Sequence, residues 1–201
     1  MKKLILAVVA VLLSWGASAA IVLPKVLGSN MVLQQNSEVN LWGKADANKK
    51  VTIIVSWQKG KIQTVADGDG KWAVKVATPA ASWDKHTITI SDGETLKLDN
   101  ILIGDVWVCS GQSNMEMPVK GFGRQPVENS MNYILSAAKE ANRIRMFTVK
   151  RARSYNEEKE DCEGGEWFCA SPQSVANMSA TAYFFAYNLA QAVDIPIGII
   201  N

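Results

Sequence analysis

The sequence is poor in histidine and cysteine and has no marked excess of charge of either sign. It contains one histidine, three cysteines and no Cys-x-x-Cys pair, so it offers no ligand set for zinc. We expect neither a metal nor another cofactor. The formal charge of +2 falls to zero, with 19 basic and 19 acidic residues, if residues 1–19 are removed. That balance indicates neither a nucleic-acid partner nor binding to an anionic membrane surface.

Long hydrophobic runs are also scarce. Lys2 and Lys3 precede an apolar run at residues 4–13, and Ala-Ser-Ala follows at residues 17–19. This pattern is typical of a secretory signal peptide, and the run is shorter than the roughly 20 residues of a transmembrane anchor. No later run is long enough to span a bilayer. We therefore expect residues 1–19 to be cleaved and the mature protein to be exported, periplasmic or extracellular, with no membrane attachment.

Export permits disulfides, and two of the three cysteines are spaced for one. Cys162 and Cys169 flank residues 163–168 and can close a short loop. Cys109 is left over in an apolar stretch. We interpret it as a small buried hydrophobic residue rather than a nucleophile, because apolar surroundings raise the pKa of a thiol.

Residues 21–102 have the pattern of a small all-β module. Short β-rich runs are separated by turn signals at residues 67–70, 91–93 and 99–100. Regularly spaced short strands favour an immunoglobulin- or fibronectin-like β-sandwich. The predicted strands are residues 38–44 (EVNLWGK), 51–57 (VTIIVSW), 60–65, 71–77 (KWAVKVA) and 86–91 (HTITIS).

Large aromatic residues are numerous in this module. Trp42, Trp57 and Trp72 lie in predicted strands, where an aromatic side chain is more often part of the core than a platform for a sugar. Trp83 lies near a connection, and we expect it to be exposed. His86 lies in an alternating strand of the module, so we interpret it as an ordinary strand residue and not as a catalytic base.

From residue 104 the pattern changes to α/β. Residues 106–109 (VWVC) are typical of a parallel strand buried on both faces, and Ser113 follows that strand. Ligands bind beyond the carboxyl ends of such strands, where a hydroxyl can meet a substrate and backbone N–H groups can face an oxyanion. Further along we predict a helix at residues 127–141, a strand at 144–149, a solvated loop at 150–161, a helix capped by Ser179 and running to about residue 193, and a strand at 195–200.

Residues 104–118 (GDVWVCSGQSNMEMP) resemble the nucleophile block of the sialate O-acetylesterases, a branch of the SGNH (GDSL-like) hydrolases. The block differs from the Gly-x-Ser-x-Gly elbow of α/β-hydrolases, because Met115 stands where that motif has glycine. Residues 166–187 are similar to the same family. The resemblance implies a serine esterase that removes O-acetyl groups from sialic acid through an acyl-enzyme on Ser113.

Three polar residues flank the expected nucleophile. Gln112, Asn114 and Glu116 are expected to shape the substrate pocket, and the alternative is that they only form hydrogen bonds within a turn or loop.

The resemblance also implies a domain organisation. Together with the patterns described above, it predicts a signal peptide at residues 1–19, a β-sandwich module at 21–102 and, at 104–201, the first part of a three-layer SGNH α/β hydrolase domain. In the family, a Gly-Gly segment directly follows the strand that corresponds to residues 195–200, and an Asn block and an Asp-x-x-His block come later; none of these is present after residue 200. We therefore expect a truncated product that is inactive by itself, because activity needs the full-length form.

Other functions fit parts of the same pattern. A secreted carbohydrate-binding protein with a non-catalytic hydrolase remnant would use Trp83 or Trp107 to stack on sugars. An acetyl esterase acting on another acetylated glycan, such as xylan, would have a similar nucleophile block. A serine peptidase is disfavoured, because the block resembles esterases.

Overall fold

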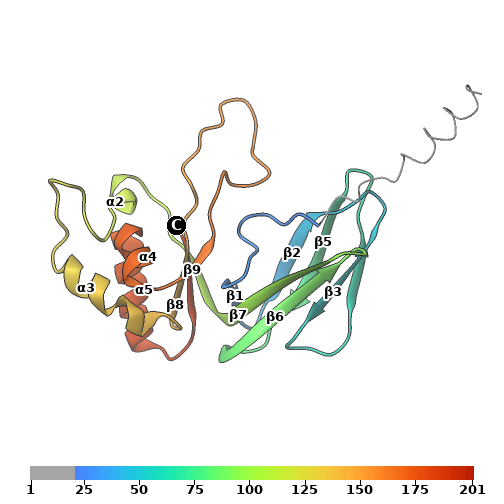
Figure 1. Ribbon diagram of the computed structural model, residues 1–201, viewed down its shortest axis with the longest axis horizontal. Helices are drawn as coiled ribbons and strands as arrows, with labels where there is room; N and C mark the ends of the chain where they lie inside the picture. Colours follow the sequence, from blue (N-terminus) through green and yellow to red (C-terminus); the bar gives the residue numbers. More distant parts are fainter. Residues whose placement is uncertain (1–20) are drawn as a thin grey trace, which may run out of the picture.

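The computed structural model describes residues 21–201 and shows a mixed α/β protein with one large sheet, one small sheet and few helices (Figure 1). The signal peptide expected at residues 1–19 lies outside the described residues. None of the helices within residues 21–201 combines the length and apolar character needed to cross a bilayer.

The first part of the chain is built entirely from strands. The strands β4, β3, β6 and β7 lie in that order in one sheet, where β1 also pairs with β7, and β2 and β5 form a separate antiparallel pair. Buried residues of both sheets, among them Leu41, Trp72, Ile53 and Ile88, share one core. The bounds are β1 (Val32–Gln34), β2 (Glu38–Lys44), β3 (Lys50–Val55), β4 (Ile62–Val65), β5 (Lys71–Ala77), β6 (Ser82–Ser91) and β7 (Thr95–Val108).

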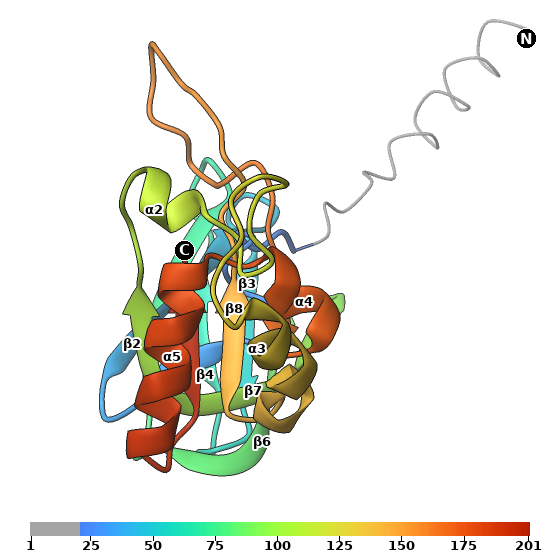
Figure 2. The same ribbon diagram turned by 90° about the vertical axis from the view of Figure 1, so that its left-hand side faces the viewer.

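The second part carries the helices. Its strands continue the large sheet in the order β7-β10-β8-β9, with β10 parallel to both β7 and β8. The helices gather on one face of these strands (Figures 1 and 2). The bounds are α2 (Ser113–Glu116), α3 (Ser130–Ser136), a 3-10 turn η1 (Ala137–Glu140), β8 (Ile144–Phe147), β9 (Trp167–Cys169), α4 (Pro172–Asn177), α5 (Ala180–Ala192) and β10 (Ile197–Ile200).

In the second part, alternate residues of a strand point to opposite faces of the sheet, and each face packs against a different core. On β8, Ile144 and Met146 pack under the helices, whereas Phe147 packs against the core of the first part. Arg145 is fully buried on that second face, where it donates hydrogen bonds to the backbone carbonyls of Asn30 and Asn100 and, at 3.0 Å, to Oδ1 of Asn100. One buried guanidinium thus ties the two parts together.

Strand β7 belongs to both parts. Its first half pairs antiparallel with β6, Leu102–Gly104 pair with β1, and residues 105–108 pair in parallel with β10. The strand therefore passes unbroken through residues 102–104, where the sequence places a boundary. The turn predicted at residues 99–100 is wrong, because Asn100 adopts a left-handed φ of 57° while the strand continues past it.

Gly104 lies where β7 changes partners. A Cβ built on this residue would lie 2.0 Å from the carbonyl oxygen of Pro196, so no larger residue fits at the start of β10 without displacement. The neighbouring Asp105 N–H donates to that same carbonyl at 3.0 Å. Glycine is required here by the close approach of two backbones.

Most of the predicted strands are confirmed within a few residues, including those at 38–44, 71–77 and 144–149, and Ser179 caps α5 as predicted. Two further predictions need correction. The helix expected over 127–141 begins at Ser130, after a left-handed Asn129, and ends as a 3-10 turn. The strand at 106–109 is not buried on both faces: Trp107 is 43% and Val108 76% exposed, because β7 has a single partner there.

Candidate functional site

Ser113 is the first residue of α2 and is exposed to solvent. The chain leaves β7 at Val108, and the N–H of Cys109 donates to the carbonyl of Ile200 at 2.8 Å, which keeps the connection beside the end of β10. Figure 1 shows α2 near the C-terminal end of the chain. Ser113 therefore lies just beyond the carboxyl ends of two parallel strands, the position where open α/β sheets bind ligands.

The residues after Ser113 are fastened to the start of α5. The hydroxyl of Thr181 donates to the backbone carbonyl of Asn114 at 3.1 Å, and the hydroxyl of Ser179 lies 3.1 Å from the sulfur of Met115. The same Ser179 accepts from the N–H of Ala182 as the N-cap of α5. A rigid helix end thus holds the short segment that carries Ser113.

The three polar neighbours of Ser113 differ in their contacts. Glu116 forms an ion pair with Arg151, on the loop of residues 148–166 that joins β8 to β9. The side chains of Gln112 and Asn114 are exposed and form no hydrogen bond with any part of residues 21–201. The role of all three in a substrate pocket stays a prediction.

No general base lies at Ser113 within the described part of the chain. The Ser113 hydroxyl has no hydrogen-bond partner in residues 21–201. His86 belongs to β6 of the first part, where its Nδ1 lies 3.1 Å from the hydroxyl of Ser56 and its ring packs edge-on against Trp57. Burial lowers the pKa of His86, and the negative charge of Asp84 raises it by a smaller amount. The structure does not bring His86 and Ser113 together.

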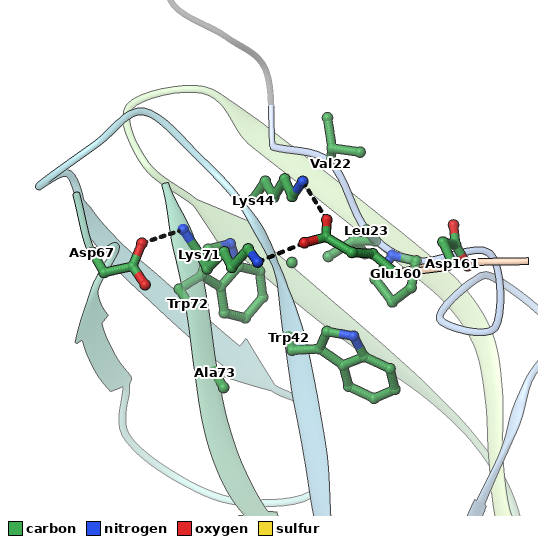
Figure 3. A pocket seen from close by; sticks show the side chains of 12 residues that line it. Val22, Leu23, Trp42, Lys44, Asp67, Lys71, Trp72, Ala73, Glu160 and Asp161 are labelled. Atoms are coloured by element: carbon green, nitrogen blue, oxygen red, sulfur yellow. Dashed lines mark hydrogen bonds and ion pairs between the residues drawn. The ribbon is translucent and has the colours of Figure 1, made fainter. Parts of the chain in front are cut away.

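A cavity that sequence reasoning missed lies on the outer face of the small sheet (Figure 3). Its volume is about 630 Å³, and its walls include Trp42, Lys44, Lys71 and, from the 148–166 loop, Glu160. Trp42 is 39% exposed there, so its prediction as a core residue is wrong. The period-2 alternation of β2 places Trp42 and Lys44 on one face and was visible in the sequence. The contact between Lys44 and Glu160 could not be seen in the sequence, because the two residues are 116 positions apart.

Curated relatives and a solved structure are similar to this chain, although no family model matches it. Sialate O-acetylesterase of Rattus norvegicus is 27% identical over 205 residues, which cover 94% of this chain and 36% of the relative. Sialate O-acetylesterase of Homo sapiens is 26% identical over 191 residues, 87% of this chain and 35% of the relative. A carbohydrate acetylesterase from Xanthomonas citri superposes with a TM-score of 0.81 at 28% identity, over 90% of this chain and 40% of that one.

This chain is a relative of the sialate O-acetylesterases. The resemblance carried by residues 104–118 is thereby confirmed at the level of the family. The chain spans about a third of the length of these curated relatives, 36% and 35% in the two cases above. The role of Ser113 as nucleophile is not decided by this kinship and stays a prediction.

The cysteines of this esterase relative are all free thiols. Cys162 packs against the first core and Cys169 lies in β9, so the disulfide that their spacing permits is not formed. Cys109 packs against the second core as expected, and burial raises the pKa of its thiol. Across residues 21–201, no three His, Cys, Asp or Glu side chains gather closely enough to hold a metal ion.

Proposed function

We propose that this chain supplies the nucleophile-bearing part of an exported serine esterase that removes O-acetyl groups from sialic acid or a related acetylated glycan. The observation that carries the proposal is the position of Ser113, exposed at the first residue of α2 and just past the parallel strands β7 and β10. The names of the relatives, sialate O-acetylesterase and carbohydrate acetylesterase, support the same chemistry.

In the proposed reaction, Oγ of Ser113 attacks the acetyl carbonyl. A bond forms between Oγ and the carbonyl carbon, the bond to the sugar oxygen breaks, and the sugar leaves as an alcohol after taking up a proton. Water then releases acetate from the acyl-enzyme. The backbone N–H of Ser113 opens α2 and has no partner within its own helix, so it is available to the oxyanion. Gln112, Asn114 and Glu116 flank this point and would contact the sugar.

The proton of Ser113 needs an acceptor, because a neutral serine hydroxyl is a weak nucleophile. No side chain among residues 21–201 forms a hydrogen bond with that hydroxyl. We therefore propose that the base and a second oxyanion donor are supplied outside the described residues, and that the full-length form is the active one.

The same proposal extends to the layout of the chain. The core shared by the two sheets of the first part supports a β-sandwich at residues 21–102. The parallel order β7-β10-β8, with helices packed on it, supports the first part of an SGNH domain at residues 104–201. The pattern of residues 1–19 supports export to the periplasm or the medium.

The decisive experiment measures acetate release from O-acetylated sialic acid by the protein expressed from the whole reading frame that contains these residues. We expect Ser113→Ala to lower kcat at least about a thousandfold, as is typical when a nucleophile is removed. Ser110→Ala makes the same change at another exposed serine of the same connection and should leave the rate within about twofold of the original. Equal rates in the Ser113→Ala protein would contradict the proposal.

The 201-residue chain alone provides a second measurement. We expect no saturable turnover of p-nitrophenyl acetate, because no base reaches Ser113 within the described residues. Turnover that disappears in Ser113→Ala would show that the chain contains its own proton acceptor. Acetylated xylan and a peptide substrate are tested beside the sialoside with the full-length protein. Release of acetate from xylan in preference to the sialoside would indicate an esterase for another acetylated glycan, and cleavage of the peptide would indicate a peptidase.

Glycan binding without chemistry is the second candidate. Trp83 is 40% exposed and lines a cavity of about 390 Å³ with Lys85 and Asp194. Trp107 is 43% exposed, but its ring packs edge-on against Phe185, with centroids 5.1 Å apart. Binding on a glycan array that survives Ser113→Ala and disappears with Trp83→Ala would favour this function.

A further inference from the structure

The outer face of the two-stranded sheet pairs two lysines directly. In the antiparallel register of β2 and β5, Lys44 lies opposite Lys71, and Trp42 lies opposite Ala73. Like charges directly opposite each other destabilise a sheet unless a counter-charge is present. The small Ala73 leaves the space beside the Trp42 ring open. The same face thus presents two ammonium groups next to an accessible aromatic ring.

The backbone at Lys44 is held in place from the N-terminal side. Lys44 and Val22 exchange two backbone hydrogen bonds, of 2.8 and 2.9 Å. Gly43 lets this segment approach, since a Cβ there would lie 2.4 Å from the carbonyl oxygen of Val22. The wall of the cavity formed by Val22, Gly43 and Lys44 is therefore held by backbone contacts and does not depend on the 148–166 loop.

The counter-charge comes from the 148–166 loop. The two carboxylate oxygens of Glu160 reach the ammonium groups of Lys44 at 2.7 Å and Lys71 at 2.5 Å (Figure 3). These contacts lower the pKa of Glu160 to about 2. Hydrogen bonding to Glu160 in turn raises the pKa of Lys71. The two lysines thus form a binding site for one carboxylate, and a side chain of the same molecule occupies it.

Glu160 holds that position weakly. Its side chain is 60% exposed, and those of Lys44 and Lys71 are 53% and 52% exposed. Ion pairs with this exposure contribute little to stability, because water and salt screen them and ordering long side chains is costly. A ligand carboxylate with further contacts to the cavity can therefore displace Glu160.

We propose that this cavity binds an acidic sugar, with the carboxylate of the sugar between Lys44 and Lys71 in place of Glu160 and with its ring against Trp42 above Ala73. The 148–166 loop then acts as a lid that competes with the ligand. The cavity of about 630 Å³ is within the usual range of small-molecule pockets, and Val22, Leu23 and Trp42 give it an apolar wall. Its two other acidic side chains, Asp67 and Asp161, already accept hydrogen bonds from backbone N–H groups. The choice of a sugar among carboxylates rests on the proposed function, whereas the carboxylate site itself does not.

The test measures binding rather than hydrolysis, and it uses the chain with Ser113→Ala, so that its outcome is independent of esterase activity. The probes are N-acetylneuraminic acid and its methyl ester, in which a methyl group removes the negative charge of the carboxylate, and binding is followed by calorimetry and by the NMR signal of the Trp42 indole N–H. Glu160→Ala should tighten binding of the acid about tenfold, as expected for a lid that is open about a tenth of the time. Glu158→Ala, on the same loop, should leave affinity unchanged.

Two further variants locate the site. Lys44→Gln with Lys71→Gln should abolish binding of the acid in the Glu160→Ala background, and Trp42→Ala should weaken it. All these side chains are exposed, and thermal unfolding checks that the variants fold. Equal affinity for acid and methyl ester, binding that survives the double lysine variant, or no binding in Glu160→Ala would each overturn the proposal. If acetate binds as tightly as the sugar, the cavity is a site for carboxylates in general, and the part of the proposal that names a sugar is wrong.

Discussion

The two halves of β7 show how one strand serves two purposes. Ile101 and Ile103, which come before Gly104, are fully buried where β7 pairs with β6 and β1. Trp107 and Val108, in the second half, pair with β10 alone and are 43% and 76% exposed. All four of these residues are apolar. What differs is the number of neighbouring strands, so the first half stabilises the fold while the second half leaves an open rim next to Ser113.

The largest expected effect is a difference in stability between variants in the two halves of β7. Ile101→Ala removes a fully buried side chain from the first core and should lower the free energy of unfolding by about 2–5 kcal/mol. Val108→Ala truncates an exposed side chain and should cost under about 1 kcal/mol. Urea denaturation of both variants measures the difference, and equal losses would show that the rim is packed as tightly as the core.

A smaller effect is expected at the point where the halves meet. Gly104→Ala forces a methyl group against the carbonyl of Pro196 and should destabilise the protein by about 1–3 kcal/mol through displacement of β10. Gly123→Ala serves as the control, because nothing lies within 4 Å of a Cβ at that position. If both variants unfold at the same urea concentration, the close contact between β7 and the start of β10 is not a constraint.

The smallest effect concerns the ion pairs that join the 148–166 loop to the first part. Because the folded-state pKa of Glu160 is lowered from 4.5 to about 2, their stabilising contribution is fully present above about pH 4.5 and is lost as the pH falls through about 2. The carboxyl NMR signal of Glu160 should titrate near pH 2. In the Lys44→Gln, Lys71→Gln variant it should titrate near 4.5. A midpoint near 4.5 in the unaltered chain would mean that the loop is not docked.

Local sequence patterns predicted the elements that carry a short-range signal of their own, such as alternation or a capping residue. The alternation of β2 and β5 and the cap at Ser179 are of this kind. The exposure of Trp42 was missed because alternation along β2 puts it on the face of Lys44 but does not say which face of the strand is covered. The run of residues 106–109 gave no sign that one flank of β7 stays unpaired beyond Gly104.

The sequence by itself indicated kinship with the sialate O-acetylesterases, through the block at residues 104–118, and it placed Ser113 after a parallel strand, because both signals lie within a few consecutive residues. The tertiary structure alone decided that β7 runs through both parts and that Glu160 reaches Lys44 and Lys71 from far along the chain. The physical reason is that strand pairing and loop docking join residues remote in sequence, and no local periodicity records which distant partner a strand or a charge will meet.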